Sequence, residues 1–324
     1  MAKKALILGV TGQDGSYMAE LLLEKGYDVH GFIRRSATGN KKNIMHILDK
    51  LTLHKGDLAD ATSLYRVIAS VKPDELYNFA DQDHVSWSYD SVDYSSDITG
   101  AAVGRILEII KQVNPAIRFF QPISSNMFGK VTQTPQTEET QLRPQSPYAC
   151  AKAYAYLLCR YYRDVFGLFA STAIFYNHES TRRTEEYVTR KITKAAARIK
   201  LGLQKKLMLG DLSQGVDFGY APDYVDAAWS ILQLPAPDDF IICTGETHTV
   251  REFLDEAFSV AGLKAADYVE FDPKLLRPSK TDTLIGDYSK AKKAFGFAPK
   301  VRFKQLVKIL VEHDLKEAEK EIKR

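Results

Sequence analysis

The sequence predicts an α/β protein, built as a doubly wound parallel sheet with a smaller, interleaved C-terminal lobe. Three observations support this prediction. Short apolar runs alternate with segments of helical period from residue 5 to about residue 254, which is the pattern of repeated βαβ units. A glycine-rich turn follows the first run directly. The length of 324 residues leaves room for about two domains of ordinary size.

Seven apolar runs are the strand candidates. They are residues 5–8, 29–33, 51–54, 75–79, 118–123, 170–175 and 240–243. Between the last two runs the alternation loosens, and a basic segment of helical period follows at 189–204. Because a strand candidate returns at 240–243, we expect interleaved domains. The first covers 1–176, with 212–254 partly returning to it, and the second lobe covers mainly 177–324.

Composition excludes several classes of protein. Lys and Arg total 44 against 41 for Asp and Glu, a net charge of +3, which is too small and too dispersed for a dedicated nucleic-acid binder. No apolar run reaches the roughly 18 residues that a membrane-spanning helix needs. Cys150, Cys159 and Cys243 lack metal-ligand or disulfide spacing. The N-terminus lacks the features of a signal peptide. We expect a cytoplasmic protein that binds neither nucleic acid nor membrane and holds no metal.

The turn after the first run has the pattern of a nucleotide site. Gly9, Gly12 and Gly15 are spaced G-x-x-G-x-x-G and precede a helical segment. Glycines let the backbone approach a pyrophosphate closely, and the following helix offers unpaired N–H groups to the anion. We assign the whole turn to a cofactor, with these residues: Gly9, Thr11, Gly12, Gln13, Asp14 and Gly15. The alternative is a tight turn with a structural role only.

The second run ends in Arg34, Arg35 and Ser36. A site selective for NAD normally places an acidic residue here, on the ribose 2′-hydroxyl. Guanidinium groups are instead suited to phosphate oxygens. The sequence therefore favours NADP over NAD, with solvent-exposed arginines of no binding role as the alternative.

Tyr148 and Lys152 form a Tyr-x-x-x-Lys pair, which places both side chains on one helix face. An ammonium beside a phenol favours the phenolate, so Tyr148 is the predicted general base for a sugar hydroxyl. Ser124 follows the fifth run and is expected to share the reacting oxygen. These three residues are the predicted catalytic set.

With these motifs, the chain resembles the extended short-chain dehydrogenase/reductases of Rossmann type, and among them the GDP-mannose 4,6-dehydratase family. The matching stretches cover nearly the whole chain: 9–23, 34–36, 127–129, 146–152, 176–180, 187–204, 223–225, 244–253 and 277–278. The resemblance implies a tightly held NADP and a GDP-hexose in the second lobe. It also implies chemistry that begins with oxidation of the sugar at C4, and a homodimer or homotetramer with a subunit contact at 36–43.

The resemblance also assigns individual residues. It places Asp57, followed by Leu58, at the adenine of the cofactor. It assigns six residues to the substrate: Ser125, Asn177, Val188, Lys191, Arg198 and Arg277. Asn177 and Arg277 would contact the phosphates. Val188, Lys191 and Arg198 would contact the guanine nucleotide. Independently of the family, a basic concentration suits a diphosphate. It comprises Arg182, Arg183, Arg190, Lys191, Lys194 and Arg198. A solvated basic helix is the alternative.

The chain departs from the family pattern at the reacting position. Asn126 stands where the family has a glutamate that works on C5 and C6 of the sugar. An amide can position a hydroxyl but cannot act as a general acid or base. Asp81 and Asp83 add two carboxylates to the loop after the fourth run, where they are expected to contact substrate hydroxyls or to replace the missing acid. Pro122 removes a backbone donor from the expected fifth strand and is expected to cause local rearrangement around Ser124.

Other positions also differ, namely Val216, Lys280, Thr181 and Thr184. We therefore prefer an enzyme that oxidises C4 of a GDP-hexose or GDP-heptose and then returns the hydride, which gives 4-epimerisation or C4 redox. The alternative is 4,6-dehydration with Asp81 or Asp83 as the replacement acid. A non-catalytic subunit that binds a nucleotide sugar is the third hypothesis.

Overall fold

The computed structural model describes residues 2–34, 36, 39–276 and 282–323. Arg35, Arg277 and Lys280, which the sequence analysis singled out, lie outside the described residues. Across the described part of the chain, no helix is both long enough and apolar enough to cross a membrane.

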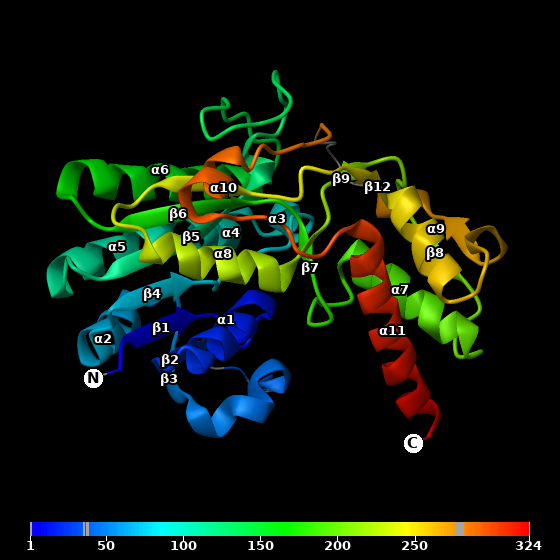
Figure 1. The fold of residues 1–324 in the computed structure, drawn as a ribbon, viewed down its shortest axis with the longest axis horizontal. Coiled ribbons are helices and arrows are strands. Elements are labelled where there is room, and N and C mark those ends of the chain that lie inside the picture. Colours follow the sequence, from blue (N-terminus) through cyan, green and yellow to red (C-terminus); the bar gives the residue numbers. More distant parts are fainter. Residues whose placement is uncertain (1, 35, 37–38, 277–281, 324) are drawn as a thin grey trace.

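A seven-stranded parallel sheet forms the centre of the larger lobe (Figure 1). Its order is β11-β6-β5-β4-β1-β2-β3. The strands are β1 (Lys4–Leu8), β2 (Asp28–Arg34), β3 (Thr52–Gly56), β4 (Glu75–Asn78), β5 (Arg118–Ser124), β6 (Ala170–Phe175) and β11 (Asp239–Ile242). All seven predicted runs are strands of this one sheet, and the predicted doubly wound α/β fold is confirmed.

Helices cover both faces of the sheet. On one face lie α2 (Ala61–Val71), α5 (Ala102–Val113) and α6 (Pro147–Phe166). On the other lie α1 (Gln13–Glu24), α8 (Ala221–Gln233), α10 (Ser289–Phe295) and the 3-10 helix Lys42–Lys50. Leu6 and Leu8 of β1 belong to the first core, whereas Ala5 and Ile7 belong to the second, because successive side chains of a strand point to opposite faces. The central strand is therefore apolar and buried from Ala5 to Leu8.

The order of the strands determines where a ligand can bind. From β1 the chain builds the sheet outward in one direction through β2 and β3, and later in the other through β4, β5, β6 and β11. In open α/β sheets, ligands bind beyond the carboxyl ends of the strands at such a switch point. The segments that follow β1, β4 and β5 meet at this edge. Two short helices, α3 (Trp87–Asp90) and α4 (Val92–Ser95), and a π-helical segment, Ser96–Ala101, lead from there into α5.

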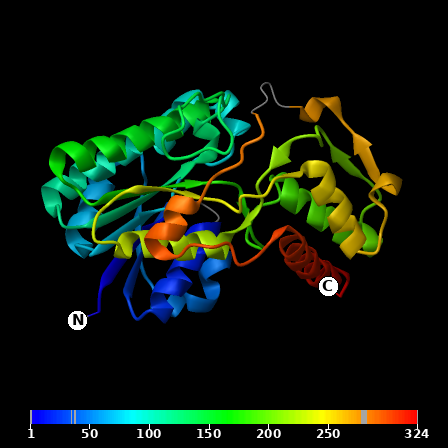
Figure 2. The same cartoon turned by 45° about the horizontal axis from the view of Figure 1, so that its top comes forward.

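The smaller lobe has a core of its own (Figure 2). Its helices are α7 (Val188–Lys200), α9 (Val250–Val260) and α11 (Phe303–Ile322), and its short strands are β8 (Leu207–Leu209), β13 (Val269–Phe271), β9 (Gly215–Val216) and β12 (His248–Thr249). Two further strands, β7 (His178–Glu179) and β10 (Gly219–Tyr220), pair with each other next to α8. The chain passes between the lobes more than once, and we retain a division near residue 176 as a proposal.

Pro122 does not interrupt β5, contrary to the expected rearrangement. The strand keeps its register with β6 through Pro122 as far as Ser124, which pairs with Phe175. Backbone N–H groups alternate in direction along a strand: that of Arg118 points toward β4 and that of Phe119 toward β6. An N–H group at residue 122 would therefore point toward β4. Pairing with β4 ends at Phe120. The missing proline N–H therefore removes no ladder hydrogen bond.

Candidate active site

The turn after β1 has the close backbone packing that a pyrophosphate site requires. Gly9 has a φ of +79°, and a Cβ there would lie 2.7 Å from the backbone nitrogen of Ala80. A Cβ on Gly15 would overlap the carbonyl oxygen of Gly9. Helix α1 begins after Gly12, and no side chain caps its first N–H groups. These groups remain available to an anion, so the turn fits the phosphates of a dinucleotide.

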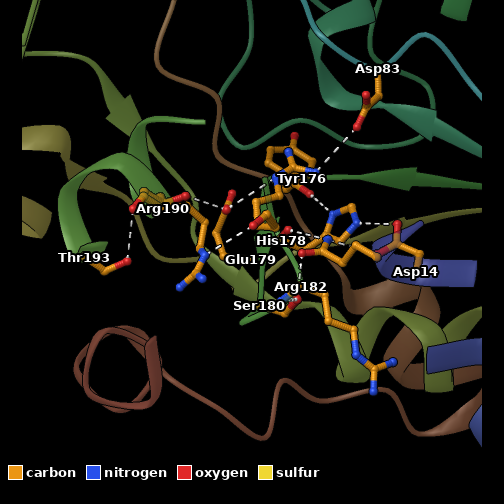
Figure 3. Close-up of polar contacts among 12 residues, drawn as sticks. Asp14, Asp83, Tyr176, His178, Glu179, Ser180, Arg182, Arg190 and Thr193 are labelled. Carbon is orange, nitrogen blue, oxygen red and sulfur yellow. Dashed lines mark hydrogen bonds and ion pairs between the residues drawn. The ribbon is translucent and has the colours of Figure 1, made fainter. Parts of the chain in front are cut away.

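Two residues of the turn also connect it to β7. Asp14 Oδ2 lies 2.8 Å from His178 Nε2, and His178 Nδ1 lies 2.9 Å from the carbonyl oxygen of Tyr176. Gln13 donates to the His178 carbonyl at 3.2 Å and accepts from Ser180 at 2.8 Å. Figure 3 shows His178 between Asp14 and Tyr176. The cofactor turn and the segment leading to the smaller lobe are therefore held together directly.

The environment of His178 favours its charged form. Burial lowers the pKa of His178, but the carboxylate of Asp14 outweighs burial, and the pKa is raised. Conversely, burial raises the pKa of Asp14, but His178 outweighs this and the pKa is lowered. Both ring nitrogens of His178 face oxygen acceptors, which an imidazolium satisfies with two N–H groups. The sequence analysis missed this pair because nothing in the spacing of residues 14 and 178 indicates contact.

The other predicted cofactor residues lie at the expected edge of the sheet. Arg34 is exposed and donates to the Tyr94 hydroxyl at 2.8 Å. Ser36 accepts a hydrogen bond from the Gly39 N–H. Asp57 accepts from the Ala59 N–H at 3.0 Å, and Leu58 is buried. The predicted contacts of these side chains with a 2′-phosphate and an adenine remain predictions.

Ser124, Tyr148 and Lys152 lie together. Helix α6 begins at Pro147, where Ser146 accepts the Ala149 N–H as the N-cap, so Tyr148 and Lys152 face the same way one turn apart. Both are buried. Ser124 ends β5, and its hydroxyl lowers the pKa of the neighbouring Tyr148 phenol. A strand end and a helix start thus place the predicted catalytic set at the carboxyl edge of the sheet.

Lys152 forms an ion pair that the sequence analysis did not predict. Its Nζ lies 2.6 Å from Asp81 Oδ2 and donates to the carbonyl of Pro122 at 3.0 Å. The Lys152 and Asp81 side chains are only 5% and 13% exposed. Asp81 follows β4 and Pro122 lies in β5, which are neighbouring strands. The order of the strands in the sheet, which the sequence did not reveal, brings these groups together.

The charges around Tyr148 oppose the predicted phenolate. Burial raises the pKa of Tyr148 most, Lys152 lowers it, and Asp81 and then Asp83 raise it again, so that it reaches about 12. The predicted effect of Lys152 has the right sign but is outweighed. Deprotonation of Tyr148 therefore needs additional positive charge in the site.

Asn126 contacts the catalytic set through Ser124. Its Nδ2 donates to Ser124 Oγ at 3.0 Å, and its backbone N–H donates to the same oxygen at 3.2 Å. The short 3-10 helix Ser125–Met127 holds it there, with Ser125 buried. Asn126 is thus in position to orient the Ser124 hydroxyl, and as an amide it moves no proton.

Asp83 faces the smaller lobe and not Lys152. Its side chain is 58% exposed, and its Oδ2 lies 3.7 Å from Arg183 Nη1. The Arg183 guanidinium stacks on Tyr187 at 3.6 Å from the ring centroid and pairs with the buried Glu179. Figure 3 shows Asp83 and Glu179 approaching this region from different segments. Asp83 therefore bridges the loop after β4 and the segment before α7.

The basic segment is not a free cationic surface, which corrects the expectation of a concentrated positive charge. Each of five basic residues pairs with a carboxylate: Arg182 with Glu20, Arg183 with Glu179, Arg190 with Asp314, Lys194 with Glu185 and Arg198 with Glu321. Within the described residues, Lys191 has no such partner. Among the six residues of the predicted basic concentration, Lys191 is therefore the one whose charge no carboxylate of the described residues offsets.

The remaining predicted substrate residues lie on the smaller lobe and the connection to it. Asn177 is exposed, and its carbonyl accepts the Gly219 N–H. Val188 begins α7 and packs against the lobe's core. A cavity of about 510 Å³ lies between residues 209–213, Arg251 and β13, and no predicted substrate residue that the structure describes lines it.

Comparisons with known proteins agree with this fold. The structure is similar to dTDP-glucose 4,6-dehydratase from Bacillus anthracis, solved in complex with NAD, with a TM-score of 0.86 and 23% identity over 98% of each chain. It is also similar to UDP-glucose 4-epimerase from Thermotoga maritima, with a TM-score of 0.87 and 21% identity over 97% of this chain and 99% of the other. The fold is that of the extended short-chain dehydrogenase/reductases.

The sequence comparisons identify the family. The family model described as GDP-mannose 4,6 dehydratase matches residues 6–310. GDP-mannose 4,6 dehydratase 1 of Arabidopsis thaliana is 48% identical over 98% of this chain and 91% of its own length. The GDP-mannose 4,6 dehydratase of Homo sapiens is 42% identical over 96% of this chain and 91% of its own length. The chain belongs to the GDP-mannose 4,6 dehydratase family and is an enzyme, which sets aside the hypothesis of a non-catalytic subunit.

Proposed function

We propose that this enzyme binds NADP and a GDP-hexose, oxidises the sugar at C4, and then completes a 4,6-dehydration. The observation that supports the first step is the meeting of Ser124, Tyr148 and Lys152 next to the glycine turn. The names of the relatives support the second step. They favour dehydration over the epimerisation or C4 redox that the sequence analysis preferred.

The chain's own groups have separate tasks in C4 oxidation. A nicotinamide cofactor whose phosphates are held by the glycine turn would supply the hydride acceptor and, in its oxidised form, the positive charge that Tyr148 needs. Tyr148 takes the proton of the C4 hydroxyl, while Ser124 hydrogen-bonds to the same oxygen. Lys152 stabilises the phenolate. Asn126 fixes the Ser124 hydroxyl through its amide. A general base of this kind contributes about 10²- to 10⁴-fold in rate.

Dehydration needs a further acid or base. The C5 proton must be removed, the C6 hydroxyl must leave as water, and the hydride from C4 must return to C6, so that the sugar loses one water without net oxidation. Asn126 cannot transfer these protons. The acidic side chains that act on Tyr148 are Asp81 and Asp83, and we propose that one of them does this work.

One observation favours a second candidate function, C4 epimerisation or C4 redox. Asn126 occupies the position of the family's glutamate. Its side-chain amide and its backbone N–H both donate hydrogen bonds to Ser124 Oγ. Without an acid or base at that position, the hydride can return to C4 and the sugar keeps its oxygen atoms. This reaction requires only Ser124, Tyr148 and Lys152.

Product mass separates the two functions. The protein is incubated with GDP-mannose and NADP, and the molecular mass of the nucleotide-sugar product is measured by mass spectrometry. The proposed dehydration predicts a product lighter by one water, whereas epimerisation leaves the mass unchanged. GDP-mannose returned with unchanged mass and unchanged C4 configuration would contradict both functions for this substrate.

We further propose a homodimer or homotetramer. The outer face of α6 exposes a row of apolar side chains at helical spacing: Tyr154, Leu157, Tyr161 and Val165. Contiguous exposed apolar surface supports a contact between protein chains, and a second copy of this chain is the proposed partner. A single monomeric species in analytical ultracentrifugation would contradict this proposal.

A further inference from the structure

The ion pair between Asp81 and Lys152 lies inside the candidate active site but is not part of the predicted catalytic set. Asp81 Oδ2 is 2.6 Å from Lys152 Nζ, and both side chains are nearly buried. A buried ammonium is costly unless a counter-charge accompanies it. The Pro122 carbonyl accepts a second N–H at 3.0 Å. Two of the three donors of Lys152 are thus engaged by protein groups, which fixes the ammonium in one place.

The carboxylate of Asp81 acts on Lys152 in preference to other groups. Within the described residues, Asp81 Oδ1 is buried and has no hydrogen-bond partner. The ion pair with Lys152 is therefore the contact through which the carboxylate acts on the site.

We propose that Asp81 is a positioning residue for Ser124, Tyr148 and Lys152, and that its carboxylate holds the Lys152 ammonium at the Pro122 carbonyl and moves proton transfer by Tyr148 to higher pH. The inference rests on the proposed function only for the role of Tyr148 as base. It adds a determinant of the pH at which that base works, whichever product the enzyme forms.

The groups around Tyr148 define the expected effect. Lys152 faces it from the same helix, Ser124 from β5, Asp81 and Asp83 from the loop after β4, and Tyr187 from the segment before α7. After burial, Lys152 is the strongest influence and lowers the pKa of Tyr148, while Asp81 raises it. Removing Asp81 leaves the ammonium unopposed, so the pKa of Tyr148 must fall.

The test is a titration of Tyr148 in the intact chain. Tyrosines are labelled with ¹³C at Cζ, the protein is saturated with oxidised NADP, and spectra are recorded between about pH 7 and pH 11. The signal that disappears in Tyr148→Phe belongs to Tyr148. Asp81→Ala should lower its midpoint by about one pH unit, the order of shift that one nearby charge produces. Alanine removes the carboxylate without adding volume to the loop, so we expect this variant to fold.

Asp83→Asn is the matched control, because it removes the same charge from the same loop without contacting Lys152. It should shift the Tyr148 midpoint less than Asp81→Ala does. Equal midpoints in the native protein and Asp81→Ala, including midpoints that both stay above pH 11, would overturn the inference. So would an equal shift in the two variants.

The pH profile of C4 oxidation gives a second measurement, and Asp81→Ala should move its rising limb to lower pH. If Asp81 is also the acid of the dehydration step, Asp81→Ala will in addition abolish the release of water, which the product mass measures separately from the Tyr148 midpoint. The titration contains no sugar. A protein that fails to transform GDP-mannose would refute the proposed function and leave this inference to be decided by the titration alone.

Discussion

The turn after β1 and the carboxyl ends of β4 and β5 form two halves of one site, and different physics determines each half. The turn depends on backbone sterics: a side chain on Gly9 or Gly15 would collide with the chain itself. The other half depends on side-chain charges, where Lys152 is balanced between Asp81 and the Tyr148 phenol. The first half fits a dinucleotide by its shape. The second half holds the side chains that we propose carry the reaction, and there we expect single substitutions to change the chemistry.

The largest expected effect tests the reacting half. Tyr148→Phe removes the proton acceptor, and we expect C4 oxidation to slow by about 10²- to 10⁴-fold. Binding of GDP-mannose should change little, because the phenol acts mainly in the transition state. Single-turnover absorbance of NADPH measures the first quantity and calorimetry the second. Undiminished oxidation in this variant would remove Tyr148 from the mechanism.

Asn126→Glu tests whether the reacting half of the site lacks an acid and base for dehydration. It restores an acid and base at the family's position, so release of water should accelerate, by up to about 10²-fold. The gain is expected to be partial, because Asp81 also changes the charge of the site. Asn126→Gln is the matched control, since it adds the same length without an ionisable group. Equal rates in the two variants would show that proton transfer at this position does not limit dehydration.

The ion pair between Asp14 and His178 holds the glycine turn against β7, and removing it tests what this contact contributes to stability. The raised pKa of His178 means that its ionic contribution to stability is complete below its ordinary pKa of 6.5 and is lost as pH rises through the folded-state value. The lowered pKa of Asp14 gives a contribution that is present above 3.8 and is lost as pH falls through the folded-state value. His178→Gln should therefore cost about 1–3 kcal/mol near pH 5 and less above pH 8. Urea unfolding at both values measures this, and a cost independent of pH would contradict it.

The smallest expected effect concerns the choice of cofactor. Arg34 is exposed, so its charge is partly screened by water and its contact with a 2′-phosphate is worth about 1 kcal/mol or less. Arg34→Ala should weaken NADP binding by up to about fivefold and leave NAD binding unchanged. Calorimetry with both dinucleotides tests this. Equal affinity of the native protein for NADP and NAD would refute the preference.

The sequence could predict the parts that depend on local pattern. Apolar runs indicated the positions of all seven strands. The four-residue spacing of Tyr148 and Lys152 placed both side chains on one face of α6. It could not predict which loops meet across the sheet, because that depends on strand order. The pairs of Asp81 with Lys152 and of Asp14 with His178 were missed for this reason. The same limit made the basic segment look unpaired, since Arg190 and Arg198 find their carboxylates on α11.

The central claim is that the reaction begins with removal of hydride from C4 and continues to dehydration. The most direct test follows that hydrogen. GDP-mannose carrying deuterium at C4 is converted by the native protein with unlabelled NADP, and the product is examined by NMR spectroscopy. The account predicts a 4-keto-6-deoxy sugar with the deuterium at C6. Deuterium at C4 of a sugar that has kept its water and has the inverted C4 configuration would contradict dehydration and establish C4 epimerisation instead.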